Sequence, residues 1–254
     1  MIPIFKSEYS LGKSILTLDK IKDKIDESRA ISIGTIAKVH NLQNLYIVDD
    51  SMTGFLKAYK ICEDLKINLR FGLRLSVVAN GNDKSENSLS TSSKIIIFIK
   101  NTEGYKDLLK IHNQASIDFF YYEKRTDWES LREKWTENLI LVYPFFDSFL
   151  YKNTLTDARC IPDDSFTPSF FFDESHHGLP FCDLIKSSLN DYVPKQEYKD
   201  RIIKSHSVYY YSKKCFPAFH TYKCINNRSN LSCPKLNNFS CDDFSFESWL
   251  TFNK

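Results

Sequence analysis

Short apolar runs alternate with amphipathic stretches along most of this chain. Runs of the kind that form buried strands occur at residues 2–5, 44–50, 68–78, 94–100, 138–144, 169–173 and 200–212. Apolar residues at helical spacing lie between them, at residues 16–40, 53–66, 102–115, 127–135 and 180–189. This alternation predicts an α/β fold with a mainly parallel sheet.

Polar residues interrupt this pattern most clearly at residues 80–93. The stretch GNDKSENSLSTSS is rich in Gly, Asn and Ser, and it precedes the apolar run KIIIFIK. Such a composition is typical of a loop inserted between two elements. Because no repeat and no linker are visible elsewhere, we predict a single domain over residues 1–254.

The composition is that of a globular protein, with 254 residues and 42% hydrophobic content. Lys+Arg and Asp+Glu number 34 and 32, so the net charge of +2 gives no general attraction to nucleic acid or membranes. Seven cysteines in irregular spacing suit a reducing compartment, and no segment resembles a signal peptide or a membrane span. We expect an intracellular protein without membrane contact.

His220, Cys224, Cys233 and Cys241 lack C-x-x-C spacing, so we expect no zinc there.

Two adjacent carboxylates, Asp49 and Asp50, end the apolar run at residues 44–50. Like charges at the end of a buried strand suggest a cation site, because their repulsion must otherwise be relieved by solvent or by basic partners. The alternative is a solvated turn that caps the helix predicted to begin near Thr53, since aspartate is common before a helix. The pattern of residues leaves both interpretations open.

Five segments of the chain carry a family resemblance. They are IFKSEYSLGKS (4–14), NLYIVDDSMTGFLKAYKICEDLKINLRFGLRL (44–75), IFIKNTEGYKDLLKIHNQASIDFFYYEKRTDWESL (97–131), FFFDESHHGLP (170–180) and CINNRSNLSCPKLNNFSCDDFSFESWL (224–250). In this order they resemble the PHP (polymerase and histidinol phosphatase) domain of bacterial family C replicative polymerases, the DNA polymerase III alpha subunit type. The resemblance covers nearly the whole chain. It implies a distorted (β/α)7 TIM-like barrel of the PHP type, with metals at the C-terminal ends of the strands in family members.

Most positions that bind metal in the family carry other side chains here. Aligned with the family motifs, the vestigial metal-site positions are Ile4, Lys6, Asp49, Asp50, Arg74, Ser116, Phe145, Ser207 and Tyr209. Three neighbouring residues are stand-ins for the less certain positions, namely His112, Asp147 and His206. A retained polar site would comprise Asp49, Asp50, Asp173, His177 and His206.

The substitutions at Ile4, Lys6 and Arg74 argue against metal binding. An aliphatic side chain cannot bind a metal, and a charged ammonium has no lone pair. Lys6 and Arg74 also bring two positive charges to Asp49 and Asp50. We hypothesise that an internal salt-bridge cluster replaces the metals and that the protein has no cofactor. The alternative is a rebuilt site for zinc or manganese.

The resemblance implies a role in DNA replication. We expect a catalytically inactive scaffold that contacts replication proteins such as a polymerase core or a proofreading exonuclease. The catalytic aspartate motif of the family's palm is missing from this sequence, so we do not expect DNA polymerisation by this chain alone. The alternative is a metal-dependent phosphoesterase or 3′–5′ exonuclease that uses the retained polar site. The expected setting is the cytoplasm of a bacterium or a phage-infected cell, where the domain would be a free-standing, phage-type form.

Aromatic and basic residues cluster in FFYYEKR (119–125) and YYYSKK (209–214). Aromatic side chains interleaved with Lys and Arg bind single-stranded nucleic acid in other proteins. This gives a third, weaker hypothesis of DNA contact. The competing interpretation is strand core flanked by surface lysines.

Overall fold

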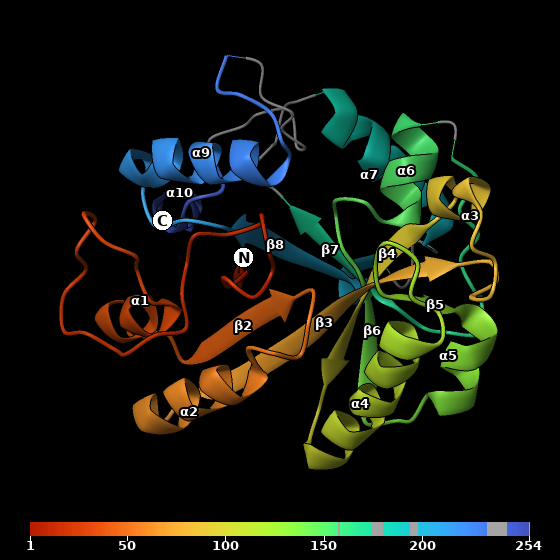
Figure 1. Cartoon of the computed structure of the whole chain (residues 1–254), viewed down its shortest axis with the longest axis horizontal. Coiled ribbons are helices and arrows are strands. Elements are labelled where there is room, and N and C mark those ends of the chain that lie inside the picture. Colours follow the sequence, from red (N-terminus) through yellow and green to blue (C-terminus); the bar gives the residue numbers. More distant parts are fainter. Residues whose placement is uncertain (157, 174–179, 194–197, 233–242, 254) are drawn as a thin grey trace. The chain divides into compact units, whose positions relative to one another are not determined.

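The computed structural model describes residues 1–156, 158–173, 180–193, 198–232 and 243–253 (Figure 1). The strands are β1 (Ile2–Phe5), β2 (Asn44–Asp49), β3 (Asn68–Val78), β4 (Ser93–Ile99), β5 (Arg125–Asp127), β6 (Leu139–Tyr143), β7 (Ser169–Asp173) and β8 (Ile202–Val208). The helices are α1 (Ile33–Val39), α2 (Phe55–Leu65), α3 (Glu86–Ser90), α4 (Thr102–Ile117), α5 (Trp128–Lys134), α6 (Phe149–Leu155), α7 (Pro180–Tyr192), α8 (Tyr198–Arg201), α9 (Phe216–Asn226) and α10 (Phe246–Phe252). Within these described ranges, no helix has the length and apolar character needed to cross a membrane.

Seven strands form a closed ring of hydrogen-bonded neighbours. The order is β2-β1-β8-β7-β6-β4-β3-β5, and β2 also pairs with β3, which closes the ring and leaves β5 as an additional strand on β3. β1 pairs in parallel with β2 and β8, whereas β4 runs antiparallel to both of its neighbours, β3 and β6. The predicted α/β, TIM-like barrel is therefore confirmed.

The chain divides into two compact units. The first comprises Met1–Phe71, Asp173–Ser175 and Ser205–Lys254, and the second comprises Gly72–Phe172 and His176–Lys204. β3 and β8 each continue from one unit into the other. The single domain over residues 1–254 remains a prediction.

In the first unit, β1 lies between β2 and β8. Ile4 is opposite Tyr46 on one side and Ser207 on the other. The fully buried side chain of Phe5 stacks on Phe246 of α10, with ring centroids 5.7 Å apart. The first strand is thus held by residues from both ends of the chain.

In the second unit, α4 and α5 pack beside β4, β5 and β6 (Figure 1). A side-chain cap fixes the start of each helix. Asn101 accepts a hydrogen bond from the backbone N–H of Gly104 at 2.9 Å, and Asp127 accepts one from Ser130 at 2.8 Å. Such caps satisfy N–H groups that have no partner inside the helix.

The helix predicted over residues 16–40 is wrong for most of its length. Only Ile33–Val39 is helical, and the buried residues Leu16 and Leu18 belong to an extended segment that bridges to Ser32. The charged residues that follow this segment are mostly exposed and present no apolar face to the core. A helix there would gain no stabilisation from packing.

The polar loop predicted at residues 80–93 contains a short helix, α3, and its last residue begins β4. Ser85 caps α3 by accepting a hydrogen bond from the N–H of Ser88 at 3.2 Å. The fully buried guanidinium of Arg125 donates to the carbonyl of Asp83 and to the hydroxyl of Ser88, each at 3.0 Å. A buried cation at the start of β5 therefore holds this segment in place.

Candidate functional site

Asp49 ends β2 with its side chain completely buried. One carboxylate oxygen accepts hydrogen bonds from the backbone N–H of Ser7 (2.9 Å) and the hydroxyl of Ser10 (2.8 Å), and the other accepts from the Ser7 hydroxyl (2.6 Å). The Ser10 hydroxyl also accepts from the N–H of Asp50 at 3.0 Å. The turn that follows β1 thus supplies the donors that a buried carboxylate needs.

Lys6 pairs with Asp50. Its ammonium lies 3.1 Å from the Asp50 carboxylate, and the side chains are 8% and 34% exposed respectively. The predicted charge compensation by Lys6 is therefore confirmed for Asp50. The alternative role of the two aspartates as helix caps is wrong, because α2 follows Gly54 without a side-chain cap.

Arg74 makes its ion pair in the second unit. Its guanidinium lies 2.8 Å from the carboxylate of Asp147 and donates to the carbonyl of Phe146 at 3.3 Å. Our hypothesis assigns Arg74 to Asp49 and Asp50. In this unit, however, its carboxylate partner is Asp147, which the sequence predicts as a stand-in for a less certain metal-site position. Each unit contains its own ion pair at positions related to the family's metal site.

A further polar group in the second unit was missed from the sequence. Ser76, two residues beyond Arg74 on β3, lies opposite Lys94 of β4. The Lys94 ammonium donates to Ser76 and to Glu123, and the Ser76 hydroxyl donates to Glu123. Burial raises the pKa of the Glu123 carboxyl, but the charge of Lys94 and these hydrogen bonds outweigh it, so the pKa lies below its ordinary value of 4.5. Arg74 and Ser76 are polar residues two positions apart in an apolar strand, so both side chains lie on one face. This spacing was the signal in the sequence that could have indicated the polar group.

Ser116 and Phe145 contribute to packing and helix structure. The Ser116 hydroxyl donates to the carbonyl of His112 within α4 at 2.7 Å. Phe145 is buried among aromatic rings, 4.9 Å from Phe146 and 5.2 Å from Phe172 between centroids. Of the three predicted residues, His112 has the chemistry of a metal ligand, and burial lowers its pKa below the ordinary 6.5.

The late predicted positions lie at the end of β8 and directly after it. Ser207 lies opposite Ile4, so the fold brings these two vestigial positions together. His206 faces the other side of the sheet, as the alternation along a strand requires, and its Nε2 lies 3.1 Å from the carbonyl oxygen of Ser245. Tyr209 stacks on aromatic rings of the first unit.

The remaining predicted pair lies at the end of β7. Asp173 is the last residue of that strand. His177 lies outside the described residues, so the pairing of these two side chains remains a prediction.

The residues at these positions do not fit a metal cluster. Ile4 offers no ligand atom, the Asp49 carboxylate accepts three hydrogen bonds from serines, and an ammonium accompanies Asp50. Across the part of the chain that the structure describes, no three His, Cys, Asp or Glu side chains converge as metal ligands do. Lys6 and Arg74 instead form ion pairs with Asp50 and Asp147 respectively.

Comparison with known proteins gives the family. Residues 5–149, more than half of the chain, match the PHP domain. The chain belongs to the PHP domain family. The matched segment of this PHP domain extends from β1 to the first residue of α6, and it includes Lys6, Asp49 and Arg74.

Two curated relatives are DNA polymerase III alpha subunits. The subunit from Thermus aquaticus is 26% identical over 157 residues, which make up 59% of this chain and 13% of the relative. The subunit from Borreliella burgdorferi is 25% identical over 166 residues, or 61% of this chain and 14% of the relative. The PHP domain therefore matches only a small part of the length of these relatives.

Proposed function

We propose that this PHP domain serves DNA replication as a catalytically inactive interaction module. The observation that carries the proposal is the Asp49 carboxylate, whose buried charge is satisfied by Ser7 and Ser10. The similarity of the chain to DNA polymerase III alpha subunits supports partners in replication and a cytoplasmic setting. The partners that we propose are a polymerase core or a proofreading exonuclease.

In this proposal, the polar residues around Asp49 stabilise the fold by joining neighbouring segments. Ser7, Ser10 and Asp49 join the turn after β1 to the end of β2, and the pair of Lys6 and Asp50 adds a second link between the same segments. Hydrolysis of a phosphoester by metal ions requires ligands that hold the ions and activate a water. An ammonium 3.1 Å from Asp50 instead favours a fixed internal contact.

Elemental analysis tests the absence of metal. The protein is purified with zinc and manganese present, beside Asp49→Ala and a double variant, Ile4→His with Lys6→His, that adds two imidazoles. We expect substoichiometric metal in the parent protein and in Asp49→Ala. Stoichiometric metal that disappears in Asp49→Ala would contradict the proposal. It would favour a phosphoesterase or 3′–5′ exonuclease, to be assayed on p-nitrophenyl phosphate and on single-stranded DNA.

A binding experiment tests the scaffold role. The PHP domain is mixed with a DNA polymerase III alpha subunit whose own PHP domain has been deleted, and separately with a proofreading exonuclease subunit. Size-exclusion chromatography then reports co-migration. We expect a complex with one of the two, and separate elution from both would refute these partners.

One exposed aromatic segment supports a second candidate function, the binding of single-stranded nucleic acid. In the segment 119–125, Phe120 is 47% exposed and Tyr122 is 79% exposed, whereas Tyr210 in the segment 209–214 is fully buried. Exposed rings are available for stacking on bases. Fluorescence anisotropy of a labelled oligothymidine tests this candidate, which predicts binding that weakens in Tyr122→Ala. No binding, or equal binding by both proteins, would exclude a role for this segment.

A further inference from the structure

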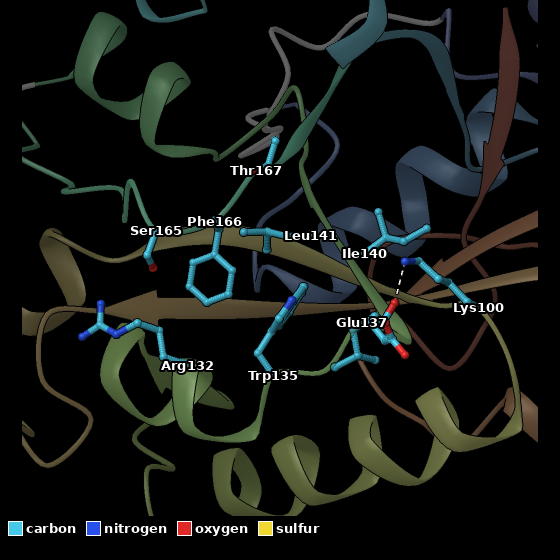
Figure 2. A pocket seen from close by; sticks show the side chains of 10 residues that line it. Lys100, Arg132, Trp135, Glu137, Ile140, Leu141, Ser165, Phe166 and Thr167 are labelled. Atoms are coloured by element: carbon cyan, nitrogen blue, oxygen red, sulfur yellow. Dashed lines mark hydrogen bonds between the residues drawn. The ribbon is translucent and has the colours of Figure 1, made fainter.

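An open pocket of about 610 Å³ lies in the second unit, at the start of β6. Its lining includes Lys100, Arg132, Trp135, Ile140 and Phe166. Arg132 lies at one end and Lys100 at the other, with Trp135 and Phe166 between them (Figure 2). Asp147 follows the opposite end of β6, so this pocket is distinct from the ion pair of Arg74 and Asp147. Its volume is in the range of ligand-binding sites.

The floor of the pocket is an apolar stretch of β6. Leu139 and Leu141 are buried, while Ile140 keeps 39% of its surface exposed. β4 pairs with Leu139, Ile140 and Leu141, whereas the pairing of β7 with β6 begins at Val142. The exposed side chain of Ile140 is the apolar contact that this stretch offers to a ligand.

Aromatic residues form a rigid wall. The rings of Trp135 and Phe166 pack edge to face, with centroids 5.0 Å apart and planes at 79°. Trp128 supports Phe166 from a centroid distance of 5.7 Å. Because Trp135 and Phe166 already contact each other, a nucleic-acid base has no slot between them. An apolar side chain would instead pack against the wall and the floor.

Charges around the rim balance. Arg132 forms an ion pair with Asp163, and the Lys100 ammonium donates to the backbone carbonyl of Glu137 at 2.5 Å (Figure 2). These four side chains carry a net charge of zero, whereas grooves for single-stranded nucleic acid are strongly positive. A guanidinium has five N–H donors and an ammonium has three, so both cations retain capacity for a further carboxylate. Trp and Arg are also the residues most enriched at energetically dominant protein contacts.

We propose that this pocket docks a segment of a partner protein that places one apolar side chain against Trp135 and Ile140. Carboxylates on either side of that anchor pair with Lys100 and Arg132. The inference goes beyond the proposed scaffold role, because it names a surface and the chemistry that it recognises. It does not depend on whether the protein binds metal.

Fluorescence anisotropy on the full chain tests this inference. The probes are labelled octapeptides with Phe, Leu, Ile, Val or Met at the centre and either Asp or Lys on both sides, together with a labelled oligothymidine. We expect saturable binding of Asp-flanked peptides, at least tenfold tighter than of their Lys-flanked counterparts. Trp135→Ala, Ile140→Ser and Lys100→Gln should each weaken it at least fivefold.

Matched variants separate docking from folding. Tyr59→Ala removes an exposed aromatic ring outside the pocket, and Lys106→Gln removes an exposed ammonium on α4. Both should bind like the parent protein, and thermal melts confirm that every variant is folded. The inference is refuted if no peptide binds saturably, if folded pocket variants bind as well as the controls, or if oligothymidine alone binds and Trp135→Ala abolishes that binding. Such a failure would leave the metal result untouched.

Discussion

The ammonium of Lys6 lies 3.1 Å from the carboxylate of Asp50, and it is the lysine of this pair that is almost fully buried. A lysine in this environment requires a nearby anion, because burial of an isolated charge is costly. The partner remains one-third exposed, so solvent screens part of the attraction. The contact is thus intermediate between a surface ion pair and a core ion pair.

Coupling between Lys6 and Asp50 should exceed that of a surface pair. A double-mutant cycle with Lys6→Met and Asp50→Asn should give a coupling energy of roughly 1–2 kcal/mol in urea unfolding. The control is the exposed pair of Lys38 and Asp23, whose nitrogen and oxygen lie 2.7 Å apart and whose coupling should be much smaller because solvent screens it. Equal coupling in both cycles would contradict this assignment.

Replacement of Asp49 by Asn should strongly destabilise the protein. The amide has one acceptor oxygen in place of two, so the donors from Ser7 and Ser10 cannot all be satisfied. We expect a loss of roughly 2–4 kcal/mol in the free energy of unfolding, measured by urea denaturation. Ser10→Ala removes a single donor and should cost about 1 kcal/mol. A near-neutral Asp49→Asn would show that these hydrogen bonds contribute little.

Glu123 should make stability depend on pH. Its pKa in the folded state is lowered, so the unfolded state binds the proton more readily. The stabilisation is present above the ordinary value of 4.5 and is lost as the pH falls through the lower folded value. The difference in unfolding free energy between the parent and Glu123→Gln should therefore shrink from pH 7 to pH 3. A difference independent of pH would argue against the contact with Lys94.

Lys66 should be replaceable by glycine with a gain in stability. It ends α2 with a φ of +55°, in the left-handed region, where its N–H donates to the carbonyl of Glu63 at 3.1 Å. A side chain in this region costs about 1 kcal/mol relative to glycine. Lys66→Gly should raise the free energy of unfolding by about 0.5–1 kcal/mol after the greater chain entropy of glycine is counted. Lys66→Ala keeps the Cβ and should give no comparable gain in thermal denaturation.

Arg125 should control access to the segment containing α3. Arg125→Met removes the buried donors to Asp83 and Ser88 and should lower the unfolding free energy by roughly 2–4 kcal/mol. Trypsin cleavage at the exposed Lys84 should also become faster. The exposed Arg70 provides a control, since Arg70→Met should change stability by less than about 0.5 kcal/mol. Unchanged cleavage in Arg125→Met would show that other contacts hold the segment.

Periodic apolar segments were predictable from the sequence. The strand expected at residues 68–78 and the helix expected at 102–115 correspond to β3 and α4. Both segments bury an apolar face, which is the property that periodicity measures. The helix predicted over residues 19–30 was wrong. The charged residues there resemble the exposed face of a helix, but the segment has no apolar face to bury.

The polar contacts were less predictable, because they join residues far apart in sequence. Arg74 and Asp147 are separated by 73 positions, and their contact depends on the pairing of β3, β4 and β6. Asp147 also adopts a φ of +63°, a backbone conformation that its neighbours in the sequence do not predict. The family motif predicted that Lys6 lies beside Asp49 and Asp50, because it carries the alignment of whole strands, but it contains no information on the partner of Arg74.

The register of β1 has a consequence for the order in which the chain folds. Ile2 is opposite Ser205, so one edge of the first strand has no hydrogen-bonding partner from β8 until residue 205 has been synthesised. During that interval, the backbone groups on this edge are open to pairing with other chains. A fragment cut at residue 149, where the family match ends, would keep this edge permanently open, so it should aggregate where the longer chain does not.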